Sequence, residues 1–487
     1  MAMIQSQETS SATGARGNAG MALPESTVQF YDSVTERLGA FSSLHRTPRP
    51  VPRPIPGLLG SRFLIWKQDP TVAVTGLRTV YVPGLVLNGP RDSRIDTELA
   101  GTTPVNRNAD GDFVFLPGTP ELDCAHTFAV VRQTLSMYER CLGGRKIPWA
   151  WNTGGNTDVI KAYPDAGVTP NAFYSRGQKA LKFFHFTPNG SSEAVFLCRS
   201  LDIVAHEAGH AILDGLKPGW LGVGNVPQTG GLHEAFGDLS AIFLALSQLD
   251  QVEALVALTK ADLHDRNFLA EVGEQFGGAI GRPAGLRNAD NNLRLSDVSN
   301  EVHAISQVFT GAIYDVLADI FNFEKRRQRR TKEPAHILLD VAQHLCSLLL
   351  RAILQTGNSG VTFADVANKM RAISAADNDP VAYRLFIRHR FMLRGVIVSP
   401  TPMAAVLAED TDFEDSKLVS GDETELLQPC EHISLEADQK QDRGGCCGTM
   451  QLPEYILGDP KALRAGKSIT EEELLAPEIK ELAAEFK

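Results

Sequence analysis

Residues 201 to 213 read Leu-Asp-Ile-Val-Ala-His-Glu-Ala-Gly-His-Ala-Ile-Leu, an apolar stretch that contains two histidines and a glutamate. In a helix, His206 and His210 lie one turn apart on the same face, which suits two nitrogen ligands of a tetrahedral zinc ion. Glu207, between them, can reach a water molecule on that metal. The plainer alternative is a buried helix whose two histidines have structural partners. A third ligand is needed to choose between these interpretations.

A second helical stretch, residues 231 to 240, offers that ligand in the sequence Gly-Leu-His-Glu-Ala-Phe-Gly-Asp-Leu-Ser. Glu234 follows His210 by 24 residues. A catalytic zinc ion takes three protein ligands and leaves the fourth position to water. Asp238, one turn after Glu234, fits a carboxylate that accepts the other ring N–H of a zinc-bound histidine, although alone it could be a solvated charge. We therefore predict a Zn2+ site made of His206, His210 and Glu234.

The two stretches together resemble the thermolysin-like zinc metallopeptidase family. Four further segments are similar to that family in the same order: Asn171 to Tyr174, Glu271 to Glu274, Leu286 to Asn288 and Val302 to Ser306. Residues 362 to 398 are similar to its closing helices. The resemblance covers roughly residues 60 to 398. It implies an α+β fold of two lobes, a β-rich N-terminal lobe and a helical C-terminal lobe, with zinc in the cleft between them.

Carried over residue by residue, the resemblance also implies a catalytic set. Glu207 would be the general base for a metal-activated water. His303 would stabilise the charge that develops on the former carbonyl oxygen. A further set would hold an extended substrate, partly by strand addition: Asn171, Ala172, Phe173, Tyr174 and Arg287. The implied activity is hydrolysis of peptide bonds in a peptide or protein substrate.

The chain departs from the family pattern near the oxyanion. The family often has a tyrosine between the metal helix and the third ligand, but no tyrosine occurs from Ala211 to His233. Trp220 and Asn225 lie in this interval, and neither carries a phenol. His233 itself stands where the family has an asparagine.

The carboxylate that orients His303 is a second point of difference. We predict Asp297 for this role, although it lies one residue farther upstream than the family pattern. Glu301 is the competing candidate.

Calcium is a further implication of the resemblance. Three acids match family Ca2+ ligands: Asp202, Glu271 and Glu274. Ala245 and Leu269 stand where other carboxylates would be. Because calcium takes six to eight oxygen ligands, the sequence leaves a calcium site open.

Composition and the resemblance together suggest four parts: a disordered, proline-rich segment 1–57, a β-rich lobe 58–205, a helical lobe 206–398 and an acidic, partly disordered tail 399–487. The net charge is -11; the tail holds 20 acidic and 8 basic residues, a net of -12, which leaves +1 for the rest. Without a dense basic stretch, nucleic acid is not an expected partner. No apolar run reaches the roughly 18 residues of a membrane span.

The seven cysteines do not show the spacing of a disulfide framework, and the N-terminus lacks a signal-peptide pattern. We therefore expect a cytoplasmic protein by default, with export by a route without a cleaved signal left open. The oligomeric state is not indicated.

Two functions remain. The first is a zinc endopeptidase that cleaves before apolar residues, because the positions that line the family's pocket for the residue after the scissile bond are aliphatic: Leu197, Ile203, Val272 and Leu286. The alternative is a catalytically weak or inactive protease-fold binding protein. The missing oxyanion donor and calcium acids favour the alternative, whereas the intact base and ligands favour the enzyme.

Overall fold

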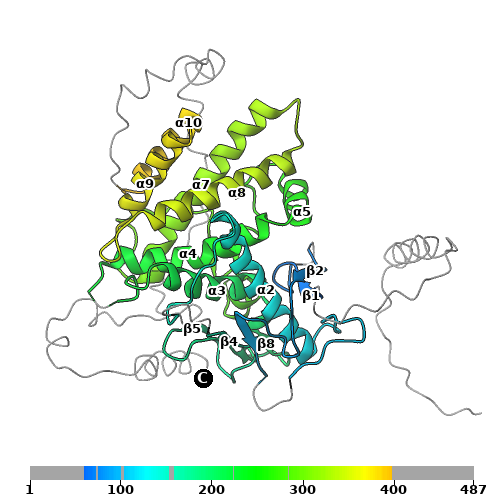
Figure 1. Cartoon of the computed structure of the whole chain (residues 1–487). Helices are drawn as coiled ribbons and strands as arrows, with labels where there is room; N and C mark the ends of the chain where they lie inside the picture. The colour runs from blue at the N-terminus through cyan, green and yellow to red at the C-terminus, as the bar shows by residue number, and fades with distance from the viewer. Residues whose placement is uncertain are drawn as a thin grey trace, which may run out of the picture. The chain divides into compact units, whose positions relative to one another are not determined.

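The computed structural model describes residues 60–396, except residues 73–74, 100–103, 153–157, 223 and 283–284. This part of the chain combines helices and sheet (Figure 1), which is compatible with the predicted α+β class. The predicted proline-rich segment 1–57 and acidic tail 399–487 lie outside the described residues.

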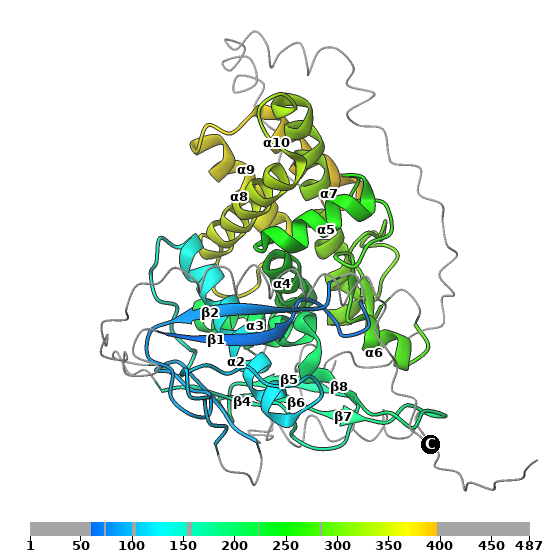
Figure 2. The same ribbon diagram turned by 90° about the vertical axis from the view of Figure 1, so that its right-hand side faces the viewer.

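Eight of the ten strands in the described part of the chain precede residue 200. The strands are β1 (Gly60–Trp66), β2 (Leu77–Pro83), β3 (Ile95–Thr97), β4 (Ile160–Tyr163), β5 (Ala172–Ser175), β6 (Ala180–Phe183), β7 (His185–Phe186), β8 (Val195–Phe196), β9 (Glu271–Val272) and β10 (Arg287–Asn288). The largest sheet has the order β3-β4-β6-β5. Its first three strands are parallel, and β5 pairs antiparallel with β6 at the edge. β1 and β2 form a separate antiparallel ribbon (Figure 2).

Helices dominate after the short 3-10 turn η1 (Leu197–Arg199). The helices are α2 (Pro120–Cys141), α3 (Leu201–Leu216), α4 (Pro227–Leu246), α5 (Leu249–Thr259), α6 (Glu274–Ala279), α7 (Val302–Gln328), α8 (Pro334–Leu354), α9 (Phe363–Ala376) and α10 (Val381–Leu393). Helix α3 contacts β5 and α2 and also packs along α4, which in turn packs on α7. The predicted metal helix therefore lies between the sheet and the helices that follow it.

Two glycines allow α3 and α4 to approach closely. A Cβ atom at Gly237 of α4 would lie 2.6 Å from the His206 ring. A Cβ atom at Gly209 of α3 would lie 2.5 Å from Ser240 Oγ. Both distances are too short for any side chain, because interiors are packed at contact distance. The glycines thus set the helix separation that places ligands from α3 and α4 beside one another.

The helices α7 and α8 are long and apolar enough to cross a membrane, judged by length and composition alone. The bent pair α4–α5 would count as a third span if its two helices were taken together. Within the described structure, 83% of the apolar window of α7 and 61% of that of α8 are buried. Packing against neighbouring helices therefore accounts for their apolar composition, and the absence of a membrane span stays a prediction.

Candidate metal centre

The structure brings the three predicted zinc ligands together from two helices. Helix α3 carries His206 and His210, and α4 carries Glu234. The two Nε2 atoms are 2.8 Å apart, and the Glu234 carboxylate lies 3.5 Å from His206 Nε2 and 3.6 Å from His210 Nε2. All three side chains are buried, and the group could hold a metal ion.

These separations fit a small tetrahedral cation. With metal–ligand bonds of about 2.0–2.1 Å, two ligand atoms of a tetrahedral zinc site are about 3.3 Å apart. The observed values of 2.8, 3.5 and 3.6 Å fall on both sides of that separation. Two imidazoles with one carboxylate also suit zinc chemically. The arrangement thus fits a metal site, while the identity of the metal is a proposal.

Asp238 orients the first histidine, as predicted for it. Its Oδ1 lies 3.0 Å from His206 Nδ1, and Arg287 Nε donates to its Oδ2 at 2.9 Å. Burial would raise the pKa of Asp238, but the charge of Arg287 and the hydrogen bond from His206 outweigh it and hold the pKa at about 2. The ionised carboxylate keeps a proton on Nδ1 and leaves His206 Nε2 for a metal.

His233 orients the second histidine, a role that sequence reasoning missed. The Nδ1 atoms of His233 and His210 are 2.6 Å apart, and the two rings stack. Burial, followed by the nearby positive charge of Arg176, lowers the pKa of His233 to about 3. A neutral His233 can accept the Nδ1–H of His210, which leaves His210 Nε2 for a metal. The sequence held one signal for this role: His233 directly precedes Glu234, at the position where the family has an asparagine.

The predicted catalytic pair flanks the ligands. Glu207 is fully buried on α3 between the two histidines. His303, near the start of α7, has its Nε2 3.4 Å from Glu234 Oε2. His303 Nδ1 lies 2.6 Å from Glu301 Oε1, and the same carboxylate caps the helix by accepting from the His303 backbone N–H. Burial would raise the pKa of Glu301, but the charge and hydrogen bonds of His303 lower it to about 2.

The structure corrects the choice of carboxylate for His303. Asp297 is exposed and accepts instead from the backbone of Arg294 and from Ser296 Oγ. Glu301 takes the role because it is the N-cap of α7, only two residues from His303. Helix geometry therefore favours Glu301, the competing candidate, over Asp297.

Between Ala211 and His233, where the family often has a tyrosine, Trp220 and Asn225 make structural contacts. Trp220 is fully buried, and its Nε1 donates to the Gly357 carbonyl. The Asn225 side chain donates to three carbonyls of its own loop and accepts from the Gly360 backbone. Neither side chain replaces the tyrosine that the family often has.

The predicted substrate segment forms the edge of the largest sheet. Ala172, Phe173 and Tyr174 belong to β5, and Asn171 precedes it. All four are buried. Tyr174 Oη donates at 2.7 Å to Asp214 at the end of α3, so part of this segment anchors the sheet to the metal helix. Arg287 lies on Asp238, as described above, and its contact with substrate stays a proposal.

The predicted calcium acids lie near one another but differ in their partners. Asp202, which is buried, and Glu274, which is half-buried, belong to one cluster, which Asp69 and Gln68 join from the loop after β1. Gln68 Nε2 donates to Asp202 Oδ1 at 2.8 Å. Glu271 instead pairs with Arg266 at 2.7 Å. Sequence reasoning missed Gln68 and Asp69, because they lie more than 130 residues before Asp202.

Burial dominates the electrostatics of this cluster. It raises the pKa of Asp202 to about 7 and, with the charges of Asp202 and Asp69, that of Glu274 to about 10. Gln68 Oε1 and Glu274 Oε2 are buried and have no hydrogen-bond partner within the described residues. A hard cation such as calcium takes oxygen ligands of this kind, so the donors present suit it although they are few.

A second group of potential metal ligands is already neutralised. His264, Asp290 and Asp315 place ligand atoms near one another. His264 Nδ1 lies 2.8 Å from Asp290 Oδ1, and Arg394 lies 2.9 Å from the Asp315 carboxylate. Arg390 is a further cation, 3.7 Å from Asp315. These partners balance the charges, so the group is best explained as a structural network.

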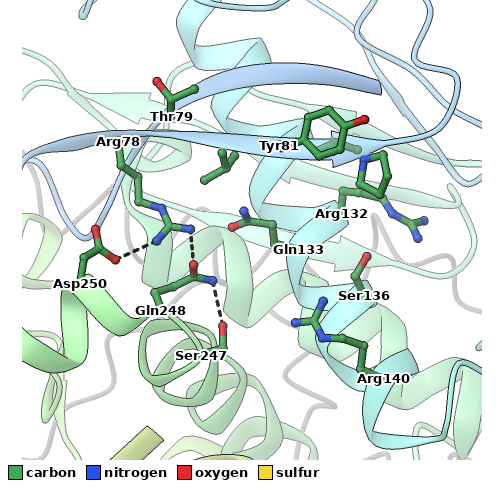
Figure 3. Close-up of a pocket in the computed structure, with 13 residues that line it drawn as sticks. Arg78, Thr79, Tyr81, Arg132, Gln133, Ser136, Arg140, Ser247, Gln248 and Asp250 are labelled. Atoms are coloured by element: carbon green, nitrogen blue, oxygen red, sulfur yellow. Dashed lines mark hydrogen bonds and ion pairs between the residues drawn. The ribbon is translucent and has the colours of Figure 1, made fainter. Parts of the chain in front are cut away.

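A polar cavity of ≈ 580 Å³ lies between β2, α2 and the junction of α4 with α5 (Figure 3). Arg78 from β2 bonds to Asp250 and Gln248 across it, as the dashed lines show. Arg132 pairs with Glu139 on its own helix. Because two of its three arginines are paired within the fold, the cavity does not indicate a ligand.

Comparison with known proteins adds no assignment: no protein-family model and no curated protein matches this chain.

Proposed function

We propose that the protein is a zinc-dependent endopeptidase. The observation that carries this proposal is the convergence of His206, His210 and Glu234 with His303 beside the same carboxylate. Support also comes from the two partners that fix the ligand rings, Asp238 and His233. A structural histidine pair would not need a third ligand at tetrahedral separation or a glutamate between its members.

The chemistry follows from the position of each group. Bound zinc would supply Lewis-acid polarisation of a water molecule and of the substrate carbonyl. Glu207 would accept the proton of that water and pass it to the leaving amine. His303, oriented by Glu301, would donate an N–H to the oxygen on which negative charge grows.

The finer features follow from the family resemblance and belong to the same proposal. They are a two-lobed thermolysin-like fold with the metal in the cleft, and an extended peptide held by Asn171, β5 and Arg287. They also include cleavage before apolar residues, and a calcium ion at Asp202 and Glu274. Loss of the oxyanion tyrosine suggests a slower enzyme, because each such donor contributes substantially to rate.

The decisive experiment compares Glu207→Gln with wild type. Glu207→Gln removes proton transfer but no ligand, so we expect one zinc per chain and a rate on casein and on peptides about 10²- to 10⁴-fold lower. Glu234→Ala should instead lose zinc, because it removes a ligand. Metal content by mass spectrometry and initial rates measure the two effects separately.

The rival function, a binding protein on a degenerate protease fold, predicts a different outcome. Zinc-loaded wild type would then hydrolyse no faster than Glu207→Gln. If both proteins instead hydrolysed the substrate at the same high rate, Glu207 would not be the general base.

A further inference from the structure

Two cysteines from distant parts of the chain lie side by side. Cys141 is the last residue of α2, and Cys346 lies in the middle of α8. Their Sγ atoms are 3.7 Å apart although the residues are 205 positions apart in sequence. Cys141 is half-buried and Cys346 is buried, and both are free thiols. The separation must close to about 2.0 Å to form a disulfide.

The two thiols differ in a way that suits exchange chemistry. The contact with Cys346 and the charge of the adjacent Arg140 lower the pKa of Cys141 against the effect of burial. The same contact, with burial, raises the pKa of Cys346 well above its ordinary value. Cys141 is therefore the nucleophile that solvent can reach, and Cys346 is the protonated partner behind it. The other two described cysteines, Cys124 and Cys198, are buried, and burial raises the pKa of each.

We propose that Cys141 and Cys346 form a reversible disulfide by exchange with a low-molecular-weight disulfide such as oxidised glutathione. The Cys141 thiolate attacks one sulfur of that disulfide and releases one thiolate, leaving a mixed disulfide on Cys141. Cys346 then gives up its proton to solvent, and its thiolate attacks Cys141 Sγ and releases the second small thiolate. Two cysteine thiols are oxidised and one small disulfide is reduced to two thiols.

The cross-link would join helices that support the candidate metal centre. Tyr138, one turn before Cys141 on α2, bonds through its hydroxyl to Ser240 Oγ of α4 at 2.9 Å and stacks on Phe236. Ser240 follows Asp238 by two residues and lies against Gly209 of α3. A bond from α2 to α8 thus fixes two helices that contact the ligand-bearing α4. This inference does not depend on the peptidase proposal.

The test uses full-length protein in which the tail cysteines are replaced, C430S/C446S/C447S, equilibrated in glutathione buffers of increasing oxidation. Peptide mapping without reduction should find a Cys141–Cys346 link. The thermal midpoint should rise by about 5–10 °C, because a long loop is closed in the unfolded chain. Adding Cys141→Ser should abolish both effects, whereas adding Cys124→Ser, the matched control, should leave them unchanged.

Adding Cys346→Ser should trap a stable glutathione adduct on Cys141, because the second attack is lost. Should this variant not fold, the Cys141→Ser comparison still decides the result. The proposal is overturned if both thiols of the folded parent protein remain fully alkylatable in excess oxidised glutathione. It is also overturned if the parent protein stops at the mixed disulfide.

Discussion

At the scale of single residues, the orientation of His210 in the candidate metal centre depends on one neighbour, His233. His210 can present Nε2 to a cation only if its proton stays on Nδ1, and His233 Nδ1 lies 2.6 Å away to accept it. The first ring has Asp238 in the same role. The two rings are therefore oriented by different chemistry, a charged acceptor for His206 and a neutral one for His210.

Replacement of His233 tests this role. His233→Ala should weaken zinc binding by about 10- to 100-fold, because such outer partners fix the tautomer and orientation of the ligand. His233→Asn, which keeps an acceptor oxygen, should remain within a few-fold of wild type. Competition with a chromophoric zinc chelator at pH 7.5 measures both affinities, and circular dichroism checks folding. Unchanged affinity in His233→Ala would show that the contact is only packing.

At the scale of elements, motif spacing and the apolar context predicted the helices that carry the chemistry. The apolar repeat and the i, i+4 histidines of α3 are local properties, as is the acidic pair of α4. Pairing between strands is not local, so the parallel partners of β4 and the two-residue strands β7 to β10 could not be predicted from the sequence. The approach of α3 to α4 depends on Gly209 and Gly237, whose meaning appears only once the partner helix is known.

In the candidate site too, local sequence features were predicted, whereas contacts between distant segments were not. The three residues predicted as ligands, which lie on two recognisable helices, do come together as a group that could hold a metal ion. Glu301 was ranked below Asp297 because the helix start that makes it an N-cap was unknown. Gln68 and Asp69 were missed because a loop from the first strand supplies them, and nothing in their local sequence marks them.

Residues of α3, of β9 and of the segment before β10 also meet where we expect the substrate residue after the scissile bond. Ile203 of α3 and Leu286 before β10 both come within 4 Å of a Cβ atom built at Gly273. Leu286 N donates to the Val272 carbonyl of β9 at 2.9 Å. Leu197 in η1 is aliphatic and buried, as are these three. A set of this kind forms either an apolar pocket or ordinary core.

A peptide-library digest separates these two interpretations. Cleavage should concentrate before Leu, Ile, Val and Phe, because an apolar side chain gains roughly 25 cal/mol per Å² buried, whereas a charged one loses hydration. Sequencing of the products by mass spectrometry gives the preference. Cleavage mainly before Lys, Arg, Asp or Glu would contradict the pocket assignment and leave the metal chemistry untouched. The Glu207→Gln protein serves as the control for contaminating proteases.

At the scale of the whole molecule, the acidic cluster ties two distant segments to α3, the helix that carries His206 and His210. Asp202 lies in the first turn of α3, Gln68 and Asp69 come from the loop after β1, and Glu274 starts α6. Gly273 N also donates to Asp202 Oδ2 at 3.2 Å. The protonation state of these carboxyls therefore affects the stability of the fold and not only a local contact.

The sign of this effect follows from the raised pKa values of about 7 for Asp202 and about 10 for Glu274. In the unfolded chain both groups titrate near pH 4. The folded state thus holds protons that the unfolded state has lost, so the stabilisation is complete below about pH 4 and declines as pH rises toward the folded pKa values. Each carboxyl can contribute at most about 1.4 kcal/mol per pH unit within its window.

Zinc-loaded wild type and Glu274→Gln should therefore respond differently to pH and calcium. Between pH 5 and 8, the free energy of unfolding of wild type should fall more steeply than that of Glu274→Gln, which keeps the shape of the side chain but cannot ionise. A bound cation stabilises ionised carboxylates. Calcium at 1–10 mM, about the range of weak sites, should therefore raise the free energy of unfolding of wild type at pH 8 and leave that of Glu274→Gln nearly unchanged. Urea denaturation with and without calcium measures both responses. Parallel pH profiles would show that Glu274 is ionised in the folded protein as it is in the unfolded chain, so that its pKa is not raised, and equal calcium responses would place the ion elsewhere.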